Sequence, residues 1–360
     1  MIQTAESVTR GHPDKVADQI SDAILDEHLR RDPHSRVAVE TLVKGDQVVL
    51  AGEVRGHNAP SEEERAAVVR ETLAAIGYSP DVYILDLVAE QSPEIAGAVD
   101  GAELGAGDQG IMYGYATSET HERLPLAQVL ARDITDLLTE YRETDSIGWL
   151  QPDGKSQVTV RDGRPRRIVV SACHREDAGF EEVKDALQAL VEDALLARGF
   201  DPSDVDLIAN PAGPWTFGGA AADAGVTGRK LMVDSYGGVG RHGGGAFSGK
   251  DPSKVDRSAA YAARQAARWL VDEAGLPWAE VSLAYAIGQA QPVMVEVSGP
   301  PLVPAASLRQ HLFDRFDFRP AAIIDRLDLL KPHYLGTAAR GHFGRPEYPW
   351  ERGGSPTRIW

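Results

Sequence analysis

The stretch from Arg241 to Arg257 reads RHGGGAFSGKDPSKVDR and says more about fold and function than any other segment. It joins a glycine-rich loop to two lysines, Lys250 and Lys254, and two aspartates, and an alanine-rich helical pattern follows over 259–270. Backbone N–H groups in glycine loops and at helix N-termini bind phosphate oxygens, and lysines add positive charge. Carboxylates in the same loop would repel phosphate unless a divalent cation lay between them. The stretch therefore predicts a polyphosphate site with a metal ion, in a loop that leads into a helix.

A P-loop is the first motif to compare with this stretch. Residues 244–250 fit G-x-x-x-x-G-K, but Asp251 follows where a P-loop has the Ser or Thr that ligates magnesium. A P-loop also follows a buried strand directly, whereas the nearest strand-like run, 230–233, precedes a second glycine loop at 237–240. The segment could instead be a plain glycine turn that ends at an Asp251 N-cap with Pro252 at N1. Such a turn needs neither two lysines nor three consecutive glycines, so a phosphate site without a Walker motif is favoured.

Composition narrows the class of protein and its partners. A length of 360 residues suffices for two or three domains, and 42% apolar with 25% charged residues is ordinary for a soluble globular protein. A net charge of −17 argues against nucleic acid as the main partner, because phosphate-backbone binding needs a basic face. The single cysteine, Cys173, fits a reducing cytoplasm. No signal peptide and no apolar run of membrane-spanning length is evident, so no membrane partner is expected.

Hydrophobic periodicity predicts strand pairs that alternate with single amphipathic helices. The predicted helices cover 13–29, 61–76, 126–141, 180–199, 252–274 and 305–313, and the predicted strands cover 36–43, 47–54, 83–89, 157–160, 167–172, 206–209, 230–233, 281–287 and 292–297. Residues 6–15 and 91–110 are expected to be loops, and Ser61 and Glu64 have the spacing of a capping box. This order favours an α+β fold, with helices on one face of each sheet, over a doubly wound parallel sheet. Units of this kind recur about three times along the chain.

Shorter segments add polar groups that suit a phosphate or metal site. Residues 11–15 place His12 and Asp14 at the mouth of the first predicted helix, which fits either a metal–phosphate site or simple capping. Asp14 also begins a run of aspartates with four-residue spacing, at 18, 22 and 26, which has the pattern of a solvated helix face. The remaining segments are a glycine loop at 105–110, a turn at 153–156, and Asp223 with 228–230, and each of them also fits an ordinary turn or surface.

Together these segments resemble the S-adenosylmethionine synthetase (methionine adenosyltransferase) family. The matching strings are ESVTRGHPDK at 6–15, ETLV at 40–43, QSP at 91–93, GAGDQG at 105–110, DGKSQV at 153–158, GRK at 228–230, the segment 241–264, and GHFGR at 341–345. They occur in family order across nearly the whole chain, and the first string and the segment 241–264 are the most specific. The fold and activity of that family are therefore expectations for this chain.

The resemblance implies an α+β fold of three similar domains around a pseudo-threefold axis, each a mixed or antiparallel sheet covered by helices. Their expected ranges are 1–94, 103–215 and 216–350. It also implies a cytoplasmic homodimer with active sites shared between subunits, often paired into a homotetramer. The implied reaction joins ATP and L-methionine. The methionine sulfur attacks C5′ of ATP, the whole triphosphate leaves, and it is then hydrolysed to pyrophosphate and phosphate.

The resemblance also assigns site residues by their position in the matching strings. The implied catalytic residues are His12, Lys155, Arg229 and Lys250. ATP binding adds Asp153, Trp215, Asp223, Lys230 and Ala246, and methionine binding is assigned to Glu53, Gln91, Asp223 and Lys254. Asp14 and Asp256 are expected to bind Mg²⁺, with two ions per site, and Glu40 is expected to bind K⁺.

Two features depart from the family pattern. Pro214-Trp215 stands where the family usually has Arg-Phe, so a cation near the nucleotide is lost and Trp215 keeps only a stacking role. The loop 91–110, which gates the active site in the family, is somewhat short. Two alternatives to the synthetase stay open: an ATP or tripolyphosphate hydrolase on the same phosphate site, and a non-catalytic nucleotide-binding subunit.

Overall fold

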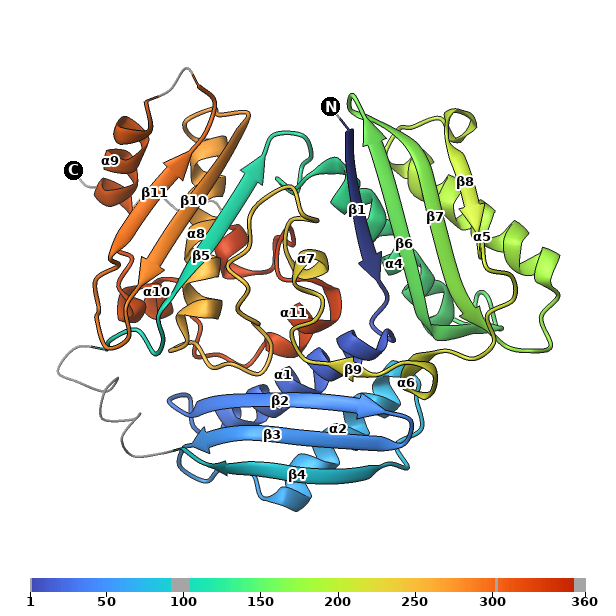
Figure 1. Ribbon diagram of the computed structural model, residues 1–360, viewed down its shortest axis with the longest axis horizontal. Helices are drawn as coiled ribbons and strands as arrows, with labels where there is room; N and C mark the ends of the chain where they lie inside the picture. Colours follow the sequence, from blue (N-terminus) through green and yellow to red (C-terminus); the bar gives the residue numbers. More distant parts are fainter. Residues whose placement is uncertain (1, 92–103, 302–303, 353–360) are drawn as a thin grey trace.

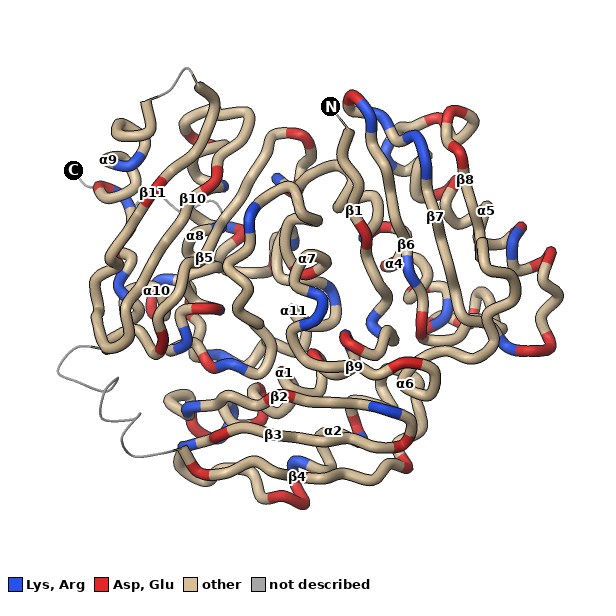
Figure 2. The backbone as a smooth tube through the Cα atoms, viewed as in Figure 1, with Lys and Arg blue, Asp and Glu red and all other residues tan. Residues whose placement is uncertain are grey.

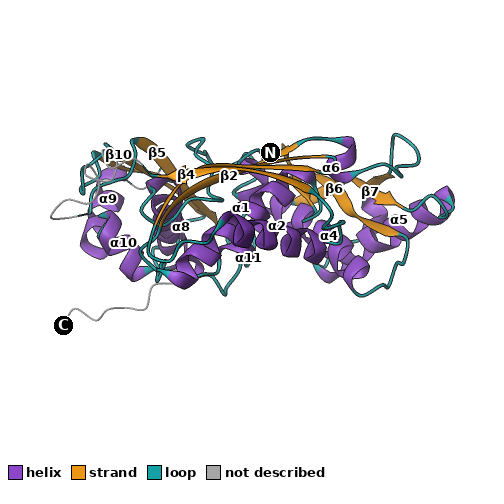
Figure 3. Cartoon of the chain, turned by 90° about the horizontal axis from the view of Figure 1, so that it is seen from below, coloured by secondary structure: helices purple, strands orange, loops and turns teal. Residues whose placement is uncertain are grey.

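The computed structural model describes residues 2–91, 104–301 and 304–352. Three sheets are arranged as a triangle around the centre of the molecule (Figure 1). Seen from the side, the helices lie on one side of the sheets, and the strands form the opposite, flatter side (Figure 3). The α+β class and the three-domain arrangement expected from the sequence are confirmed. No helix in the described ranges is both long and apolar enough to cross a membrane.

The first sheet has the order β4-β3-β2-β9. Its strands are β2 (Arg36–Lys44), β3 (Gln47–Arg55), β4 (Tyr83–Glu90) and β9 (Gly225–Val226), and the helices behind it are α1 (Pro13–Arg31) and α2 (Glu62–Ile76). Strands β2 and β3 form the expected antiparallel hairpin, and β4 runs parallel to β3 because α2 serves as the crossover. The capping box predicted at Ser61 and Glu64 is formed at the start of α2.

The second sheet follows the same plan, with β8 parallel to β7, whereas the third sheet has three antiparallel strands among the described residues. The second, β1-β6-β7-β8, consists of β1 (Ile2–Val8), β6 (Leu150–Arg161), β7 (Arg164–His174) and β8 (Asp206–Ala209), backed by α4 (Leu126–Glu143) and α5 (Phe180–Ala197). The third, β11-β10-β5, consists of β5 (Gly110–Thr117), β10 (Trp278–Tyr285) and β11 (Met294–Ser298), backed by α8 (Val255–Asp272), α9 (Ala305–Arg315) and α10 (Pro320–Arg326). Short helices α6 (Gly219–Ala222), α7 (Leu231–Asp234) and α11 (Tyr334–Arg340) lie in the connecting segments.

Each sheet takes one strand from a distant part of the chain. β1 pairs with β6, β5 pairs with β10, and β9 pairs with β2, all antiparallel. The N-terminal part thus donates a strand to the second sheet, the middle part to the third sheet, and the C-terminal part to the first sheet. The exchange is cyclic, so the three parts interlock. The domain boundaries expected at 94/103 and 215/216 remain a prediction. Because of the exchanged strands, each sheet contains residues from two of the three expected domains.

Helix α8 is buried on nearly all sides and packs on β5 and β10. Its alanines let it approach the sheet closely: a Cβ at Gly114 of β5 would collide with the backbone of Ala263. One apolar core joins α1, α8 and the first and third sheets, and a second core lies between the second sheet, α4 and α5. The connecting segments are therefore held against a rigid frame.

Several predicted elements differ in the structure. The run 230–233 is not a strand, because 231–234 form α7. The helix predicted from 252 begins at Val255, and its N-cap is Lys254 instead of Asp251. The turn considered at 153–156 lies inside β6. β1 and β5 were not predicted, and residues 6–8 and 110, which were expected to be loop, belong to them.

Candidate active site

The first group of predicted site residues gathers at the N-terminus of α1. His12 is the N-cap of this helix, and its Nδ1 accepts a hydrogen bond from the backbone N–H of Asp14 at 3.1 Å. Asp14 accepts from the N–H of Val226 at 3.0 Å and from Lys230 Nζ at 2.6 Å, and Arg229 Nε lies 3.4 Å away. Figure 2 shows the basic positions that precede α7 beside this helix start. The structure thus brings together a histidine, a carboxylate and two cations around a helix N-terminus.

His12 is neutral in this setting. Burial, together with the charges of Lys230 and Lys155, lowers the pKa of His12 to about 3. Because Nδ1 accepts the N–H of Asp14, the ring proton is placed on Nε2. His12 therefore presents a single N–H donor beside cationic side chains, which is the arrangement that an anionic oxygen would need.

β6 supplies Asp153 and Lys155 to the same group. Lys155 is exposed and lies opposite Val8, at the end of β1 that leads toward His12. Asp153 is buried and accepts from the N–H of Gly219, and burial raises the pKa of Asp153 to about 6. The charges of Lys155 and Asp223 act on Asp153 as well, so Asp223 also belongs to this group.

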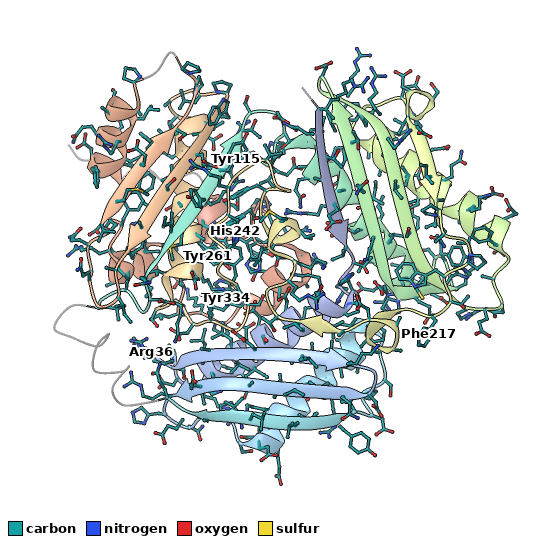
Figure 4. The ribbon with its side chains drawn as sticks, viewed as in Figure 1. Arg36, Tyr115, Phe217, His242, Tyr261 and Tyr334 are labelled. Carbon is teal, nitrogen blue, oxygen red and sulfur yellow. The ribbon has the colours of Figure 1, made fainter. Side chains whose placement is uncertain are left out.

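Trp215 is fixed beside the first group by hydrogen bonds at both ends. Its backbone N–H donates to His174 Nε2 at 3.1 Å, and its indole Nε1 donates to the carbonyl of Phe217 at 3.0 Å. Phe217 is 66% exposed at the lower end of the second sheet (Figure 4). The segment from Trp215 to Gly219 therefore offers one fixed and one exposed aromatic ring near Asp153.

The second group gathers where the glycine loop meets α8. Lys250 Nζ donates to Asp256 at 2.6 Å, and Lys254 donates to Asp251. A Cβ at Gly245 would lie 2.2 Å from an Asp256 carboxylate oxygen, so the loop lies directly over the start of α8. The loop does lead into the helix as predicted, although the helix begins four residues after Asp251.

Methionine-assigned residues lie next to the second group. Lys250 forms an isolated antiparallel bridge with Ala38 of β2, and Ala38 in turn lies opposite Glu53 of β3. Gln91 donates its backbone N–H to Val54, the residue after Glu53, and its Oε1 is buried without a hydrogen-bond partner. Glu53 and Gln91 are thus brought to the same end of the first sheet as Lys250. The rest of the expected gate loop, 92–103, lies outside the described residues.

The two groups lie at opposite ends of β2. Val226, beside Asp14, pairs with Leu42, whereas Lys250 bridges to Ala38 four residues earlier. At about 3.3 Å per residue, these two attachment points are separated by roughly 13 Å. The loops between the groups are in direct contact, since a Cβ at Gly228 would lie 2.6 Å from the Cβ of Ala246. Ala246 therefore sits at the junction of the two groups.

The carboxylates expected to bind magnesium are split between the groups. Asp14 is paired with Lys230, and Asp256 is paired with Lys250. Among the described residues, no cluster of three or more His, Cys, Asp or Glu side chains has the arrangement of a metal site. Glu40 is exposed on β2, opposite Ala51. One chain alone therefore offers isolated carboxylates to a hard cation and no complete ligand set.

Sequence reasoning missed the buried ion pairs that support these groups. Lys15 pairs with Asp18 at 3.0 Å and with Asp234 at 2.5 Å, and Arg257 pairs with Asp22 at 2.6 Å. Three aspartates of α1, at 14, 18 and 22, are at most 1% exposed, so the expectation of a solvated acidic face is wrong. A signal for these pairs was present in the sequence. Lys15 and Arg257 lie in the segments 6–15 and 241–264, which also contain the predicted site residues.

Fold and site together define a class: a three-domain α+β protein in which cations and carboxylates gather at the starts of two helices, α1 and α8. Family models for S-adenosylmethionine synthetase match most of the chain, with the N-terminal domain at 1–93, the central domain at 103–215 and the C-terminal domain at 217–352. The S-adenosylmethionine synthase of Salinibacter ruber is 49% identical over 97% of this chain and 94% of that protein. Those of a Sulfurovum and a Nitratiruptor species are 48% and 46% identical, over 98% and 97% of this chain and 95% of each of those proteins.

The chain belongs to the S-adenosylmethionine synthetase family. It is accordingly a methionine adenosyltransferase, which forms S-adenosylmethionine from ATP and methionine. The comparisons give no support to a hydrolase or to a non-catalytic subunit.

Proposed function

We propose that the two groups of residues bind ATP and L-methionine so that the methionine sulfur attacks C5′ of ATP and displaces the triphosphate. The observation that carries this proposal is the gathering of His12, Lys230 and Arg229 around Asp14 at the N-terminus of α1. A thioether is already nucleophilic when neutral, so no general base is needed. The main catalytic requirement is stabilisation of the charge that develops on the leaving triphosphate.

Residue roles follow from the position of each group. Lys155, Arg229, Lys230 and Lys250 hold the triphosphate, and His12 donates to the oxygen that leaves C5′. Asp153, Asp223, Trp215 and Ala246 surround the nucleoside, with Trp215 stacking on the base. The triphosphate, held by the same cations, is then hydrolysed to pyrophosphate and phosphate.

Methionine is assigned to Glu53, Gln91, Asp223 and Lys254. The carboxylates suit its ammonium group and, later, the cationic sulfonium of the product. The unpartnered Oε1 of Gln91 is an acceptor for the same ammonium, and Lys254 suits the methionine carboxylate. Glu53 and Lys254 thus match the two opposite charges of the amino acid.

Two Mg²⁺ ions and one K⁺ ion complete the proposed site. Asp14 and Asp256 would hold magnesium, and Glu40 would hold potassium, because hard cations prefer carboxylate oxygens. When bound, these ions neutralise phosphate charge during the reaction. Asp14 and Asp256 are each paired with a lysine in this chain, and these lysines would turn to the triphosphate when it binds and leave the carboxylates to hold the metal ions.

A cytoplasmic homodimer with shared active sites explains why these ligands are split within one chain. The outward face of the first sheet carries an apolar row in which Leu42, Val49 and Leu85 are neighbours, and Leu87 lies beside it. Leu42, Leu85 and Leu87 are 40–56% exposed. An exposed apolar sheet face of this kind marks a protein partner. With a second copy on this face, the first group of one protomer would meet the second group of the other. Two such dimers would form the tetramer that the family resemblance implies.

The test is an assay of all products. The chain, incubated with ATP, methionine, Mg²⁺ and K⁺, should form S-adenosylmethionine together with equal amounts of pyrophosphate and phosphate. Lys250→Ala should reduce turnover by about 100-fold or more without loss of folding, while Lys331→Ala, at an exposed surface lysine, should not. Phosphate release that does not depend on methionine, with no sulfonium product, would support the hydrolase and overturn the proposal.

A further inference from the structure

Four aspartates on one face of α1 each hold a segment from another part of the chain. They stand four residues apart, and each accepts a hydrogen bond from a backbone N–H far away in sequence. Asp14 accepts from Val226, Asp18 from Gly228, Asp22 from Gly249, and Asp26 from Tyr334 and Leu335, all at 2.8–3.0 Å. One helix face thus fixes the backbone of three connecting segments.

The two middle aspartates hold their loops in the same way. Gly228 and Gly249 both have φ of +80°, a conformation that favours glycine. The N–H of each donates to an α1 carboxylate at 2.8 Å. The residue after each glycine is a cation assigned to the triphosphate, Arg229 in one loop and Lys250 in the other. The contact between an α1 carboxylate and a glycine N–H therefore occurs twice, each time immediately before a proposed phosphate-binding side chain.

The second loop is held at two backbone positions, the N–H of Gly249 and the carbonyl of Lys250. Asp22 accepts from the N–H of Gly249 through one oxygen and from Arg257 at 2.6 Å through the other. Arg257 also donates to the carbonyl of Lys250 at 3.0 Å. The side chains of Asp22 and Arg257 are fully buried. These contacts leave the backbone around Lys250 little freedom to shift.

Stability alone does not explain why the charged side chains of Asp22 and Arg257 are buried beside this loop. Moving a carboxylate and a guanidinium out of water is costly, and well-packed apolar groups often serve the core equally well. The same holds for Asp18, whose buried carboxylate is paired with Lys15. A charged acceptor instead gives a short, directional contact to a backbone N–H, which fixes position better than apolar packing does.

We propose that Asp18 and Asp22 are positioning residues: they fix Gly228 and Gly249 and thereby hold Arg229 and Lys250 in place for the leaving triphosphate. This inference rests on the proposed function, because it takes the two cations to bind phosphate. Small errors of placement are expensive in such a site, since a shift of about 1 Å can reduce the rate by about 100-fold.

Asp26 provides a matched control on the same helix face. Like Asp22, it is a buried carboxylate with two hydrogen-bond donors, but the segment it holds begins at Tyr334, in the interior beside α8 (Figure 4), and contains no proposed site residue. An Asp→Asn change leaves one oxygen for two donors in either position. The two variants therefore remove one acceptor oxygen from a site loop and from a structural loop, and Asp22→Asn in addition leaves the buried Arg257 without its counter-charge.

The experiment compares Asp18→Asn, Asp22→Asn and Asp26→Asn in the full chain by kcat, KM for ATP and methionine, and Tm. We expect Asp18→Asn and Asp22→Asn to lower kcat by about tenfold or more, with KM for methionine changed less than about threefold. Asp26→Asn should lower Tm less than Asp22→Asn, because it leaves no buried cation unpaired, and should leave kcat within about twofold. Equal loss of kcat in all three variants would mean general destabilisation and would overturn the inference.

A double-mutant cycle separates this inference from the proposed function. Once Lys250 is alanine, its placement no longer matters, so adding Asp22→Asn to Lys250→Ala should change kcat by less than about twofold. Full additivity of the two effects would contradict positioning. If Lys250→Ala alone kept normal turnover, the role of Lys250 would fail instead. Should Asp22→Asn not fold, Arg257→Lys in the same cycle serves, because a lysine cannot reproduce the forked contacts of Arg257.

Discussion

Asp26 shows at the residue scale how burial changes one carboxyl group. Burial raises the pKa of Asp26 to about 6, although two backbone N–H groups favour the ionised form. In the unfolded chain the pKa is about 3.9. Between pH 4 and 6 the folded state therefore binds more protons than the unfolded state, and its stability falls as the pH rises through this range.

A pH series of urea unfolding tests this effect of Asp26. The free energy of unfolding of the wild type relative to Asp26→Asn should be larger at pH 5 than at pH 7.5, because the asparagine does not titrate. A relative stability that is constant or that increases with pH would show that the pKa of Asp26 is not raised in the folded state.

Gly249 gives a second test at this scale. Its φ is +80°, and a Cβ would collide with the carbonyl oxygen of Val39. Gly249→Ala should therefore cost more than the roughly 1–3 kcal/mol of left-handed strain alone, as measured by urea unfolding. Gly163→Ala is the control, because Gly163 has φ of +74° with nothing within 4 Å of the added Cβ. Equal losses in both variants would show that Val39 can move aside.

At the residue scale, a local sequence pattern identified neighbouring residues, while their roles stay predictions. His12 and Asp14 were singled out because histidine, carboxylate and lysine meet at a helix start, and the structure does bring them together with Lys230. Asp18 and Asp22 were misread because four-residue spacing describes a helix face but does not reveal what covers it. Their partners, Gly228 and Gly249, lie more than 200 residues away.

At the scale of elements, prediction depended on whether an element is defined by its own residues. The amphipathic helix α2 and its capping box were found because their signals are local. β1 was missed because its strand character depends on pairing with β6, about 150 residues later. α7 was misread as a strand because a four-residue apolar run has no period that separates helix from strand.

The short helix η2 (Pro349–Glu351) supplies a prediction for an element. Glu351 forms a bidentate pair with Arg264 of α8, at 2.9 Å for both contacts, and also accepts from Arg268. Because Glu351 and Arg264 are fully buried, Glu351→Gln leaves a guanidinium without its counter-charge. The variant should lose about 3–5 kcal/mol of unfolding free energy.

Asp317→Asn is the surface comparison for Glu351→Gln. Asp317 pairs with Arg319 where both side chains are about 40% exposed, and its loss should cost no more than about 1 kcal/mol. A Glu351→Gln variant that unfolds at the same urea concentration as the Asp317→Asn variant would show that η2 does not anchor the C-terminal segment.

At the scale of the whole molecule, the outward face of the first sheet is the proposed dimer interface. Leu87 on β4 is 56% exposed. Leu196 is 59% exposed and belongs to α5, one of the helices on the opposite side of the molecule (Figure 3). Leu87→Asp should shift the chain toward monomer in size-exclusion chromatography and reduce S-adenosylmethionine formation by at least about tenfold, since an unpaired charge in an apolar interface is costly. Leu196→Asp should change neither. If Leu87→Asp stayed dimeric and active, the first sheet would not be the interface.

The cyclic exchange of strands also sets an order of events during synthesis. When β1 leaves the ribosome, its partner β6 is still about 150 residues from being made, a wait of roughly 8–30 s at ordinary elongation rates. β2 likewise waits for β9, and β5 waits for β10. No sheet can be completed from its own stretch of nascent chain, so unpaired strand edges persist until most of the polypeptide has emerged. Newly made chains should therefore depend on chaperones more than the modest size of each domain suggests.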